Sequence, residues 1–211
     1  MTVEHLEVVV EDLSMEAALR LLLPKITSVE TFEIYPHQCK GDLLLRLPQR
    51  FQGYKRRIQN DPWFRDHCRI VVIVDRDDDD CHLLKQRLEE MAEAAGLTTR
   101  AHARSGLYIV VNRIAVEELE AWYFGDWQAV RQAFPRVPAT VPYQAKYRRP
   151  DDIAGGTSEA LERLLQRAGY FSGGLRKVEM ARTLAYHMVP ERNVSPSFRA
   201  LRDALLEMSA P

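Results

Sequence analysis

Two short apolar runs, each ending directly on acidic residues, constrain the fold of this chain most. Residues 6–10 and 70–74 are rich in valine and isoleucine. Short apolar runs of this kind are typical of strands that are buried on both faces of a parallel sheet. The first run ends at Glu11 and Asp12, and the second ends at Asp75. The sequence therefore predicts buried strands with carboxylates at their carboxyl ends.

Helical and strand patterns alternate through the first 120 residues. Ser14 can cap a helix over residues 14–23, which Pro24 is expected to end. Pro48 and Gly53 are expected to break a second helix over residues 41–60. The remaining expected strands are 31–35, 98–103 and 108–111, and the remaining helices here are 83–95 and 116–124. Such alternation predicts an α/β fold with a doubly wound, largely parallel sheet.

The amino-acid composition of the chain changes after residue 134. Residues 135–156 are rich in proline, glycine and basic residues, which is typical of a long functional loop. Three helices are expected after it, over residues 159–168, 175–188 and 198–208. We therefore divide the chain into an α/β domain over residues 1–134 and a basic loop with a helical C-terminal part, packed on that domain, over residues 135–211.

Charge and cysteine content limit the class of protein. The chain carries 29 Lys and Arg against 30 Asp and Glu, so overall charge gives no argument for nucleic-acid binding. Its three cysteines form no C-x-x-C pair, which argues against a disulfide framework or a zinc knuckle. The N-terminus is too acidic for a signal peptide, and no apolar run approaches the roughly 18 residues of a membrane span. We expect a soluble cytoplasmic protein with no membrane contact.

Ligands of open α/β sheets bind beyond the carboxyl ends of the strands, where the acidic residues lie. Asp75 and Asp77 are alternate residues and are expected to point to the same side. Clustered carboxylates raise each other's pKa unless a cation neutralises them, and their oxygens suit Mg²⁺ or Mn²⁺. Capping of the next helix explains the acidic residues 78–80 equally well. Glu11, taken by itself, could be an ordinary surface carboxylate that follows a strand. Neither explanation suits Asp75, because a charge at the end of an apolar strand is partly desolvated.

A second acidic group lies at residues 117–120. In a helix over residues 116–124, Glu117 and Glu120 share one face, while Glu118 is turned away by about 100°. Glu120 alone is explained by a favourable position in the first helical turn. Trp122 is more typical of a core residue than of a base-stacking platform.

Basic residues form the complement to these acids. They could together neutralise a phosphate backbone, with Tyr143 and Tyr147 adding aromatic surface, or they could be ordinary solvated faces. The candidates are Lys55, Arg56 and Arg57 in the second helix, Lys146, Arg148 and Arg149 in the long loop, and Arg176 and Lys177.

Several segments resemble known families. Residues 10–16, VEDLSME, resemble the Glu-Gly-x-Ser/Thr-x-Glu opening of Toprim domains, and residues 74–77, VDRD, resemble their Asp-x-Asp strand end. Asp12 stands where Toprim domains usually carry glycine. Residues 116–122, 155–158 and 193–198, together with Lys177, are similar to the bacterial domain-of-unknown-function family 4276. That family is grouped with the Toprim domains of OLD-type nucleases and is often encoded beside an ATPase in phage-defence neighbourhoods.

The resemblance implies a Toprim-like, Mg²⁺- or Mn²⁺-dependent nuclease that cleaves or nicks DNA, with RNA as a further substrate to consider. It also implies a separately encoded ATPase partner in a phage-defence module. Glu11 would be a metal ligand or general acid/base, Asp75 and Asp77 would hold metal, and Glu120 would complete a second metal position. Lys177 would stabilise negative charge on the phosphate.

Two other functions stay open at this point. Asp75 and Asp77 could be the nucleophile and acid/base of a haloacid-dehalogenase-type phosphatase, although Asp79 stands where that chemistry uses Thr or Val. The chain could also be a non-catalytic Toprim-like module that binds nucleic acid or an ATPase. Use of ATP by the chain itself is not expected, because it has no G-x-x-x-x-G-K-[ST] loop.

Overall fold

The four strands of the described chain form one parallel sheet. The computed structural model describes residues 3–104 and 107–209. Strands β1 (His5–Val10), β2 (Thr31–Pro36), β3 (Cys68–Asp75) and β4 (Val110–Ala115) are ordered β2-β1-β3-β4. Every neighbouring pair is parallel, with Val8 paired to both Ile34 and Val71. All four carboxyl ends therefore meet at one edge of the sheet.

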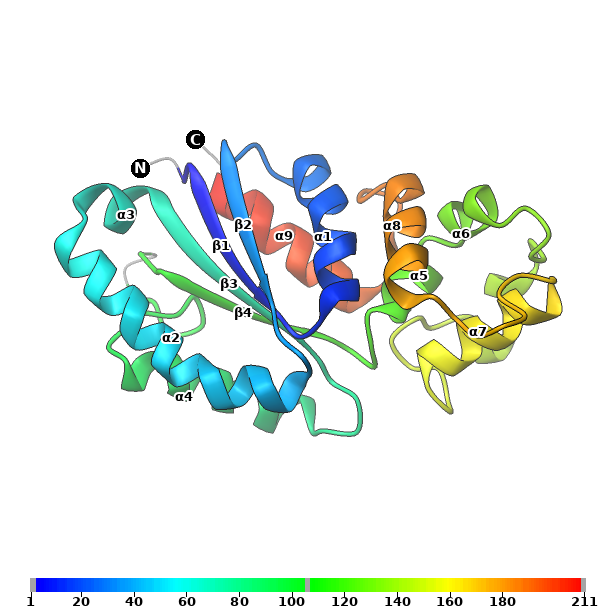
Figure 1. The fold of residues 1–211 in the computed structure, drawn as a ribbon, viewed down its shortest axis with the longest axis horizontal. Helices are drawn as coiled ribbons and strands as arrows, with labels where there is room; N and C mark the ends of the chain where they lie inside the picture. Colours follow the sequence, from blue (N-terminus) through cyan, green and yellow to red (C-terminus); the bar gives the residue numbers. More distant parts are fainter. Residues whose placement is uncertain (1–2, 105–106, 210–211) are drawn as a thin grey trace.

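Helices cover both faces of this sheet. Residues of α2 (Lys40–Asn60), α3 (Pro62–His67) and α4 (Cys81–Ala94) share one apolar cluster with alternate residues of the central strands, such as Val9 and Val72. Residues of α1 (Leu13–Ile26) and α9 (Pro196–Ser209) pack in a second cluster with the opposite set, such as Val8 and Val71. Figure 1 shows these two layers on either side of the strands. The expectation of a doubly wound α/β fold is thus confirmed in its layers and strand directions.

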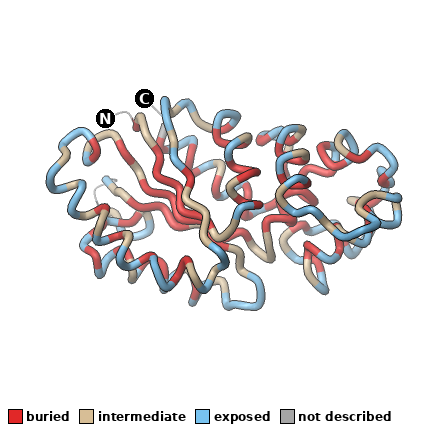
Figure 2. Tube along the Cα trace, viewed as in Figure 1, coloured by how far each residue is buried: buried red, intermediate tan, exposed pale blue. Residues whose placement is uncertain are grey.

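A group of helices lies beyond one end of the sheet. It comprises α5 (Glu120–Gly125), α6 (Trp127–Ala133), α7 (Thr157–Arg167) and α8 (Lys177–His187), with two short 3-10 turns at Val141–Tyr143 and Ala145–Tyr147. Lys25 in α1 donates hydrogen bonds of 2.7–3.0 Å to three carbonyl groups at the end of α8. The apolar cluster on the α1 side continues into these helices, as the buried segments in Figure 2 show. One core therefore joins the sheet to the helical part.

Three residues that were expected to end or break a helix do not do so. Helix α2 runs without interruption through Pro48 and Gly53, and α1 continues past Pro24 to Ile26. In α2, Leu43, Leu47, Phe51 and Tyr54 are buried at helical spacing. Packing of this face against the sheet outweighs the local cost of a proline in the helix. Asp12, rather than Ser14, caps α1, because its side chain accepts a hydrogen bond from the Met15 amide at 2.8 Å.

The region from residue 98 to 120 differs most from expectation. The strand expected over residues 98–103 is reduced to an isolated bridge between Thr99 and Val110. The strand expected at 108–111 instead spans Val110–Ala115, so the helix expected at 116–124 begins only at Glu120. Residues 117 and 118 therefore lie in the connection between β4 and α5, and Glu117 takes a left-handed φ of 65°. Residues 105–106 lie outside the described residues.

None of the helices in the described parts of the chain is both long enough and apolar enough to cross a membrane.

Candidate functional site: a carboxylate cluster at the sheet edge

Glu11 and Asp75 meet at the carboxyl edge of the sheet. Glu11 directly follows β1, and Asp75 is the last residue of β3. These two central strands pair in parallel up to Val10 and Ile73. The Asp75 amide donates a hydrogen bond of 3.1 Å to Oε2 of Glu11. Burial and the charge of Asp77 raise the pKa of Glu11 above its ordinary value, against the opposing effect of the Asp75 amide and of Lys40. Both acids therefore lie at the carboxyl ends of buried central strands, where the sequence predicts carboxylates.

Asp75 has a buried carboxylate whose negative charge is disfavoured by burial and by the neighbouring acids. Its Oδ1 atom is buried and has no hydrogen-bond partner. Burial raises the pKa of Asp75 well above its ordinary value, and the neighbouring charges of Glu11, Glu120, Asp12 and Asp77 raise it further. Buried polar atoms without partners are rare in folded proteins and call for a specific explanation. Burial and these neighbouring charges therefore favour the protonated form of Asp75 in the metal-free protein.

Glu120 joins the cluster from the helical part beyond the end of the sheet. It is the first residue of α5 and only 4% exposed. Burial raises the pKa of Glu120 to about 7, and the opposing attraction of Lys177 is the next largest influence. Lys177 begins α8, and its pKa lies above the ordinary value because Glu120, Glu118, Asp12 and Asp75 together outweigh the effect of burial. The structure thus brings Lys177 into the field of two of the acids that the resemblance named, Glu120 and Asp75.

Asp77 is placed differently from the expectation. Strand β3 ends at Asp75, and Asp77 lies in a turn with a left-handed φ of 48°. Strand alternation therefore does not apply to it, and the expectation that Asp75 and Asp77 share a side by period two is wrong. Asp77 instead forms an ion pair of 2.7 Å with Lys40. Asp79 pairs with the same lysine at 2.7 Å, and Asp80 caps α4 through the His82 and Leu83 amides.

Lys40 is a site residue that the sequence-based reasoning missed. It is the first residue of α2, and its ammonium group also donates to the carbonyl oxygens of Asp75 and Arg76 at 3.2 and 2.9 Å. A lysine in the first turn of a helix faces the positive end of the helix dipole, which is unfavourable. That unfavourable position was the signal in the sequence that Lys40 has another contact. It ties the turn after β3 to the start of α2.

Glu117 and Glu118 do not share a helical face with Glu120, because neither belongs to α5. Glu117 forms an ion pair with Arg76. Oε2 of Glu118 accepts hydrogen bonds from the Thr157 hydroxyl at 3.0 Å and from the Ser158 amide at 2.7 Å. This contact gives the segment 155–158 a structural role, since it joins the start of α7 to the β4–α5 connection. An open hollow of about 620 Å³ beside this contact is lined mainly by acidic residues: Asp77, Asp78, Glu117, Glu118 and Glu159, with Gly155 and Gly156.

Tyr123 is a second residue that sequence-based reasoning missed. It lies three residues after Glu120 on α5, so the two share a face, and its buried hydroxyl has no hydrogen-bond partner. Burial raises the pKa of Tyr123 well above its ordinary value, and the negative charges of Glu120, Asp12 and Asp75 raise it further. Trp122, next to it, is 1% exposed and belongs to the core as expected.

The segment 193–198, which carried part of the family resemblance, also has a structural role. Asn193 Nδ2 donates to the Trp122 carbonyl at 2.8 Å, and the Ser195 hydroxyl donates to Asp151 at 2.6 Å. Trp122 Nε1 donates to the Ser197 hydroxyl at 3.2 Å. The two contacts of Trp122 join α5, which begins at Glu120, to the start of α9 and the segment before it.

The basic candidates of the second helix do not join the cluster. Lys55, Arg56 and Arg57 lie near the end of α2, beside the amino ends of the strands, where Lys55 donates to the Gly96 carbonyl at 2.8 Å. Arg57 pairs with Glu7 at 3.1 Å, and Arg56 is exposed. The candidate set therefore does not act as one patch on the surface that carries the acids.

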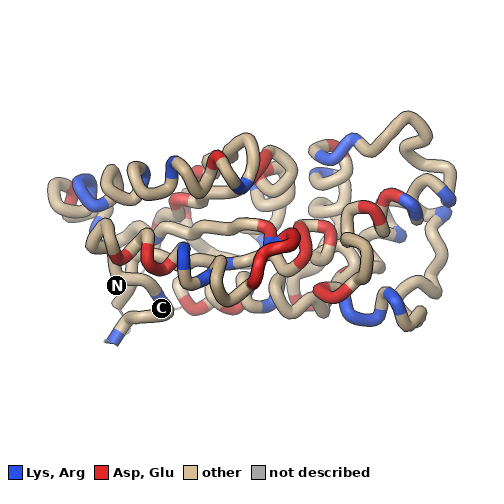
Figure 3. The backbone as a smooth tube through the Cα atoms, turned by 90° about the horizontal axis from the view of Figure 1, so that it is seen from below, with Lys and Arg blue, Asp and Glu red and all other residues tan. Residues whose placement is uncertain are grey.

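The basic residues of the long loop lie in the helical part. Lys146, Arg148 and Arg149 are exposed around the second 3-10 turn, and Arg149 pairs with Asp152 at 2.5 Å. Tyr143 is exposed, whereas Tyr147 is buried and stacks on Phe124. Figure 3 shows the acidic residues gathered near the middle of the long axis, with basic residues toward both ends.

The carboxylates approach one another without closing around a single point. Among residues 3–104 and 107–209, no three His, Cys, Asp or Glu side chains are close enough together to hold a metal ion. The cluster as it lies is a set of mutually repelling acids with Lys40 and Lys177 on its rim.

Comparison with known proteins identifies a family but no characterised relative. A family model described as Domain of unknown function (DUF4276) matches residues 10–206. No curated protein and no solved structure matches the chain.

Proposed function

Because the chain belongs to the DUF4276 family, whose description names no function, we propose its function from the site: a Toprim-like, Mg²⁺- or Mn²⁺-dependent nuclease that cleaves or nicks DNA. One observation carries this proposal. A buried, unpartnered carboxylate oxygen of Asp75 lies in the field of Glu11 and Glu120, and such an arrangement is costly without a cation. The resemblance of residues 10–16 and 74–77 to Toprim motifs supports the same function.

The residues of the cluster suit a hard divalent cation. All donors are carboxylate oxygens, which Mg²⁺ and Mn²⁺ prefer, and Asp75 Oδ1 offers a lone pair that no protein group uses. Glu11, Asp75, Asp77 and Glu120 would hold the ions, which requires that these side chains come closer together than they lie in the described structure. When bound, divalent ions stabilise the charge that develops on a phosphoryl group during in-line displacement.

The chain's own residues supply the remaining chemistry. In the metal-free protein burial raises the pKa of Glu120 to about 7, so this carboxyl group can exchange a proton near neutral pH. A bound cation would favour the ionised form of Glu120, in which it would serve as a metal ligand. Lys177 lies in the same field and offers a positive charge to the phosphate. Lys40 acts as a positioning residue, because it holds the Asp77 turn against α2.

The proposal includes an ATPase partner, encoded separately, in a phage-defence module. It rests on the family resemblance rather than on a surface of this chain. Cleavage by the purified protein, alone or only with the protein encoded beside it, distinguishes a self-sufficient nuclease from one that its partner activates.

A plasmid-nicking assay tests the nuclease. Wild-type protein with Mg²⁺ or Mn²⁺ should convert supercoiled plasmid to nicked or linear forms, EDTA should abolish this, and Asp75→Asn and Glu120→Gln should each reduce the rate at least about 100-fold. Asp203→Asn is the matched control, because Asp203 is an exposed acid paired with Arg202 on α9. Intact DNA and RNA under all conditions, with and without the neighbouring protein, would refute the proposal in favour of a non-catalytic module.

Metal binding is measured separately from cleavage. A ligand that binds only the folded state raises the free energy of unfolding, by about 2.7 kcal/mol at a hundred times its Kd. Mn²⁺ should therefore raise the melting temperature of the wild type and leave that of Asp75→Ala unchanged. An equal shift in both proteins would show that the ion binds elsewhere.

A further inference from the structure

A groove lined by arginines runs along α2, outside the acidic cluster. Its volume is about 480 Å³, and its polar lining includes His37, Arg46, Gln49, Arg50, Arg56 and Arg57. Except for His37, these lie at helical spacing on one face of α2. At 1.5 Å per residue the arginine row spans about 16 Å. The face of α2 beside this groove is therefore a continuous basic row.

Two of the four arginines have no acidic partner. Arg46 pairs with Asp42 at 2.5 Å, and Arg57 pairs with Glu7 at 3.1 Å and lies 3.9 Å from Asp61. Among the described residues no ion pair is recorded for Arg50 or Arg56. The groove therefore keeps a surplus of positive charge.

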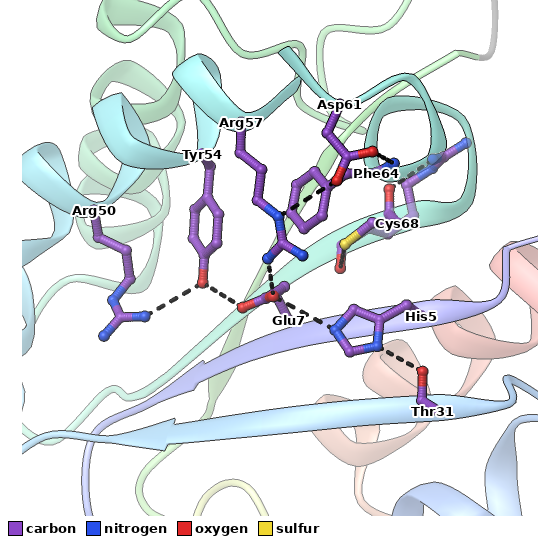
Figure 4. A network of polar contacts seen from close by, with 10 residues as sticks. His5, Glu7, Thr31, Arg50, Tyr54, Arg57, Asp61, Phe64 and Cys68 are labelled. Atoms are coloured by element: carbon purple, nitrogen blue, oxygen red, sulfur yellow. Dashed lines mark hydrogen bonds and ion pairs between the residues drawn. The ribbon is translucent and has the colours of Figure 1, made fainter. Parts of the chain in front are cut away.

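Arg50 is held in place by aromatic contacts. Its guanidinium lies 4.4 Å from the centre of the Tyr35 ring, and its Nη1 donates to the Tyr54 hydroxyl at 3.3 Å. Tyr54 in turn donates to the buried Glu7 at 3.0 Å. Figure 4 shows Arg50, Tyr54 and Arg57 projecting from α2 toward Glu7 on β1. A guanidinium fixed in this way keeps free N–H donors for a planar or tetrahedral anion at little entropic cost.

His37 supplies an independent sign of a ligand in the same groove. Its Nδ1 lies 3.0 Å from Oδ2 of Asp42, whereas its Nε2 is buried and has no hydrogen-bond partner. The Asp42 carboxylate fixes the ring so that Nε2 is the atom left over. With its Nδ1 proton shared with Asp42, the ring donates from Nε2 only in its protonated form, and an anion oxygen in the groove would accept that hydrogen bond.

The groove leads to the acidic cluster. The His37 amide donates to the Val10 carbonyl at 3.0 Å, and Val10 is followed by Glu11. One end of the arginine row therefore lies beside the strand end that carries the cluster. The other end lies toward the amino ends of the strands, where Arg57 meets Glu7.

We propose that this groove binds the phosphate backbone of a nucleic-acid strand and guides it toward the carboxylate cluster, an inference that rests on the proposed nuclease function. Arginines recognise phosphate oxygens through paired N–H donors, and a row of about 16 Å is long enough to meet several successive phosphates of one strand. A free phosphate-bearing small molecule shares this chemistry, and the experiment below separates the two sources.

Binding is tested on the full chain with fluorescently labelled single- and double-stranded DNA in EDTA, so that cleavage cannot interfere. The double variant Arg50→Gln/Arg56→Gln should bind at least about tenfold more weakly at 100 mM salt, and the slope of log K against log salt should fall by about 1–2. The control Arg87→Gln/Arg182→Gln removes two exposed arginines from α4 and α8 and should leave both quantities unchanged. Equal weakening in both variants would overturn the proposal. Matching melting temperatures verify that both variants are folded.

Further outcomes distinguish this proposal from the nuclease proposal. Wild-type protein that binds DNA through the groove but never cleaves it with Mg²⁺ or Mn²⁺ would refute the nuclease and support the groove. Wild-type protein that binds no DNA would overturn the groove as a nucleic-acid site. If inorganic phosphate or pyrophosphate then raises the melting temperature of the wild type and not of the double variant, the groove takes a small phosphate ligand instead.

Discussion

The backbone amide of Asp75 donates a hydrogen bond to Oε2 of Glu11 across 3.1 Å. The donor is a main-chain group, so the contact does not depend on the Asp75 side chain. Substitution of that side chain therefore changes the charge of the cluster and leaves the position of Glu11 unaffected. This makes the two acids separable in experiments.

Asp75→Asn should stabilise the metal-free protein at neutral pH. The pKa of Asp75 is higher in the folded state than in the unfolded state. Above about pH 4 the unfolded chain loses this proton more readily, so the free energy of unfolding falls as the pH rises. Asparagine has nearly the same size as aspartate but no charge, so it removes this cost in unfolding free energy. Each kcal/mol gained raises the melting temperature by about 2–4 °C in a chain of this length. Thermal unfolding at pH 7 and pH 4 checks this: the gain should shrink at pH 4, and a lower melting temperature for the variant at pH 7 would contradict it.

Glu120 should make stability pH-dependent. Its pKa of about 7 in the folded state lies above its ordinary value of 4.5, so the folded state binds more protons between these limits. The free energy of unfolding should therefore fall as the pH rises from about 4.5 to 7, by up to about 1.4 kcal/mol per pH unit from this group. Urea unfolding of wild type and Glu120→Gln at pH 5 and pH 8 measures it. The variant should lose part of the difference between the two pH values, and an unchanged difference would show that Glu120 titrates normally.

Lys40→Gln should loosen the turn after β3. The substitution removes ion pairs to Asp77 and Asp79 and hydrogen bonds to two carbonyl groups. Because both carboxylates are about half exposed, we expect a loss of only about 1–2 kcal/mol in unfolding free energy. Amide exchange should accelerate over residues 76–80. Lys146→Gln, which removes an exposed lysine, is the control, and equal effects of the two changes would refute the role of Lys40.

Two glycine substitutions should have opposite effects. In Gly125→Ala the new methyl group would lie 2.1 Å from Asn193 Oδ1 and 2.8 Å from the Ser195 amide nitrogen, so the α5–α9 contact must shift, at a cost of about 1–3 kcal/mol or more. In Gly53→Ala the methyl group meets nothing within 4 Å inside α2, and alanine should stabilise that helix by about 0.5–1 kcal/mol. Urea unfolding of both variants compares them, and a stable Gly125→Ala protein would show that the contact is loose.

The position of Glu11 and Asp75 was predictable from the sequence, because parallel strands end at the same edge of a sheet. The place of Asp77 was not, because the strand ends at Asp75 and a left-handed turn follows. The start of α5 was likewise missed. Glu117 and Glu118 continue a helical pattern in the sequence, but β4 runs on to Ala115 and leaves them in the connection.

The sequence by itself determined the elements with strong local signals. Apolar runs define the central strands, because only a doubly covered sheet buries them, and amphipathic spacing defines α2 and α4. Only the tertiary structure decided which charged groups meet. Glu120, Tyr123 and Lys177 reach Asp75, and Lys40 reaches Asp77, through packing between elements far apart in the chain. Local patterns do not identify the partners in these contacts, because the partners depend on how α2, α5 and α8 dock against the edge of the sheet.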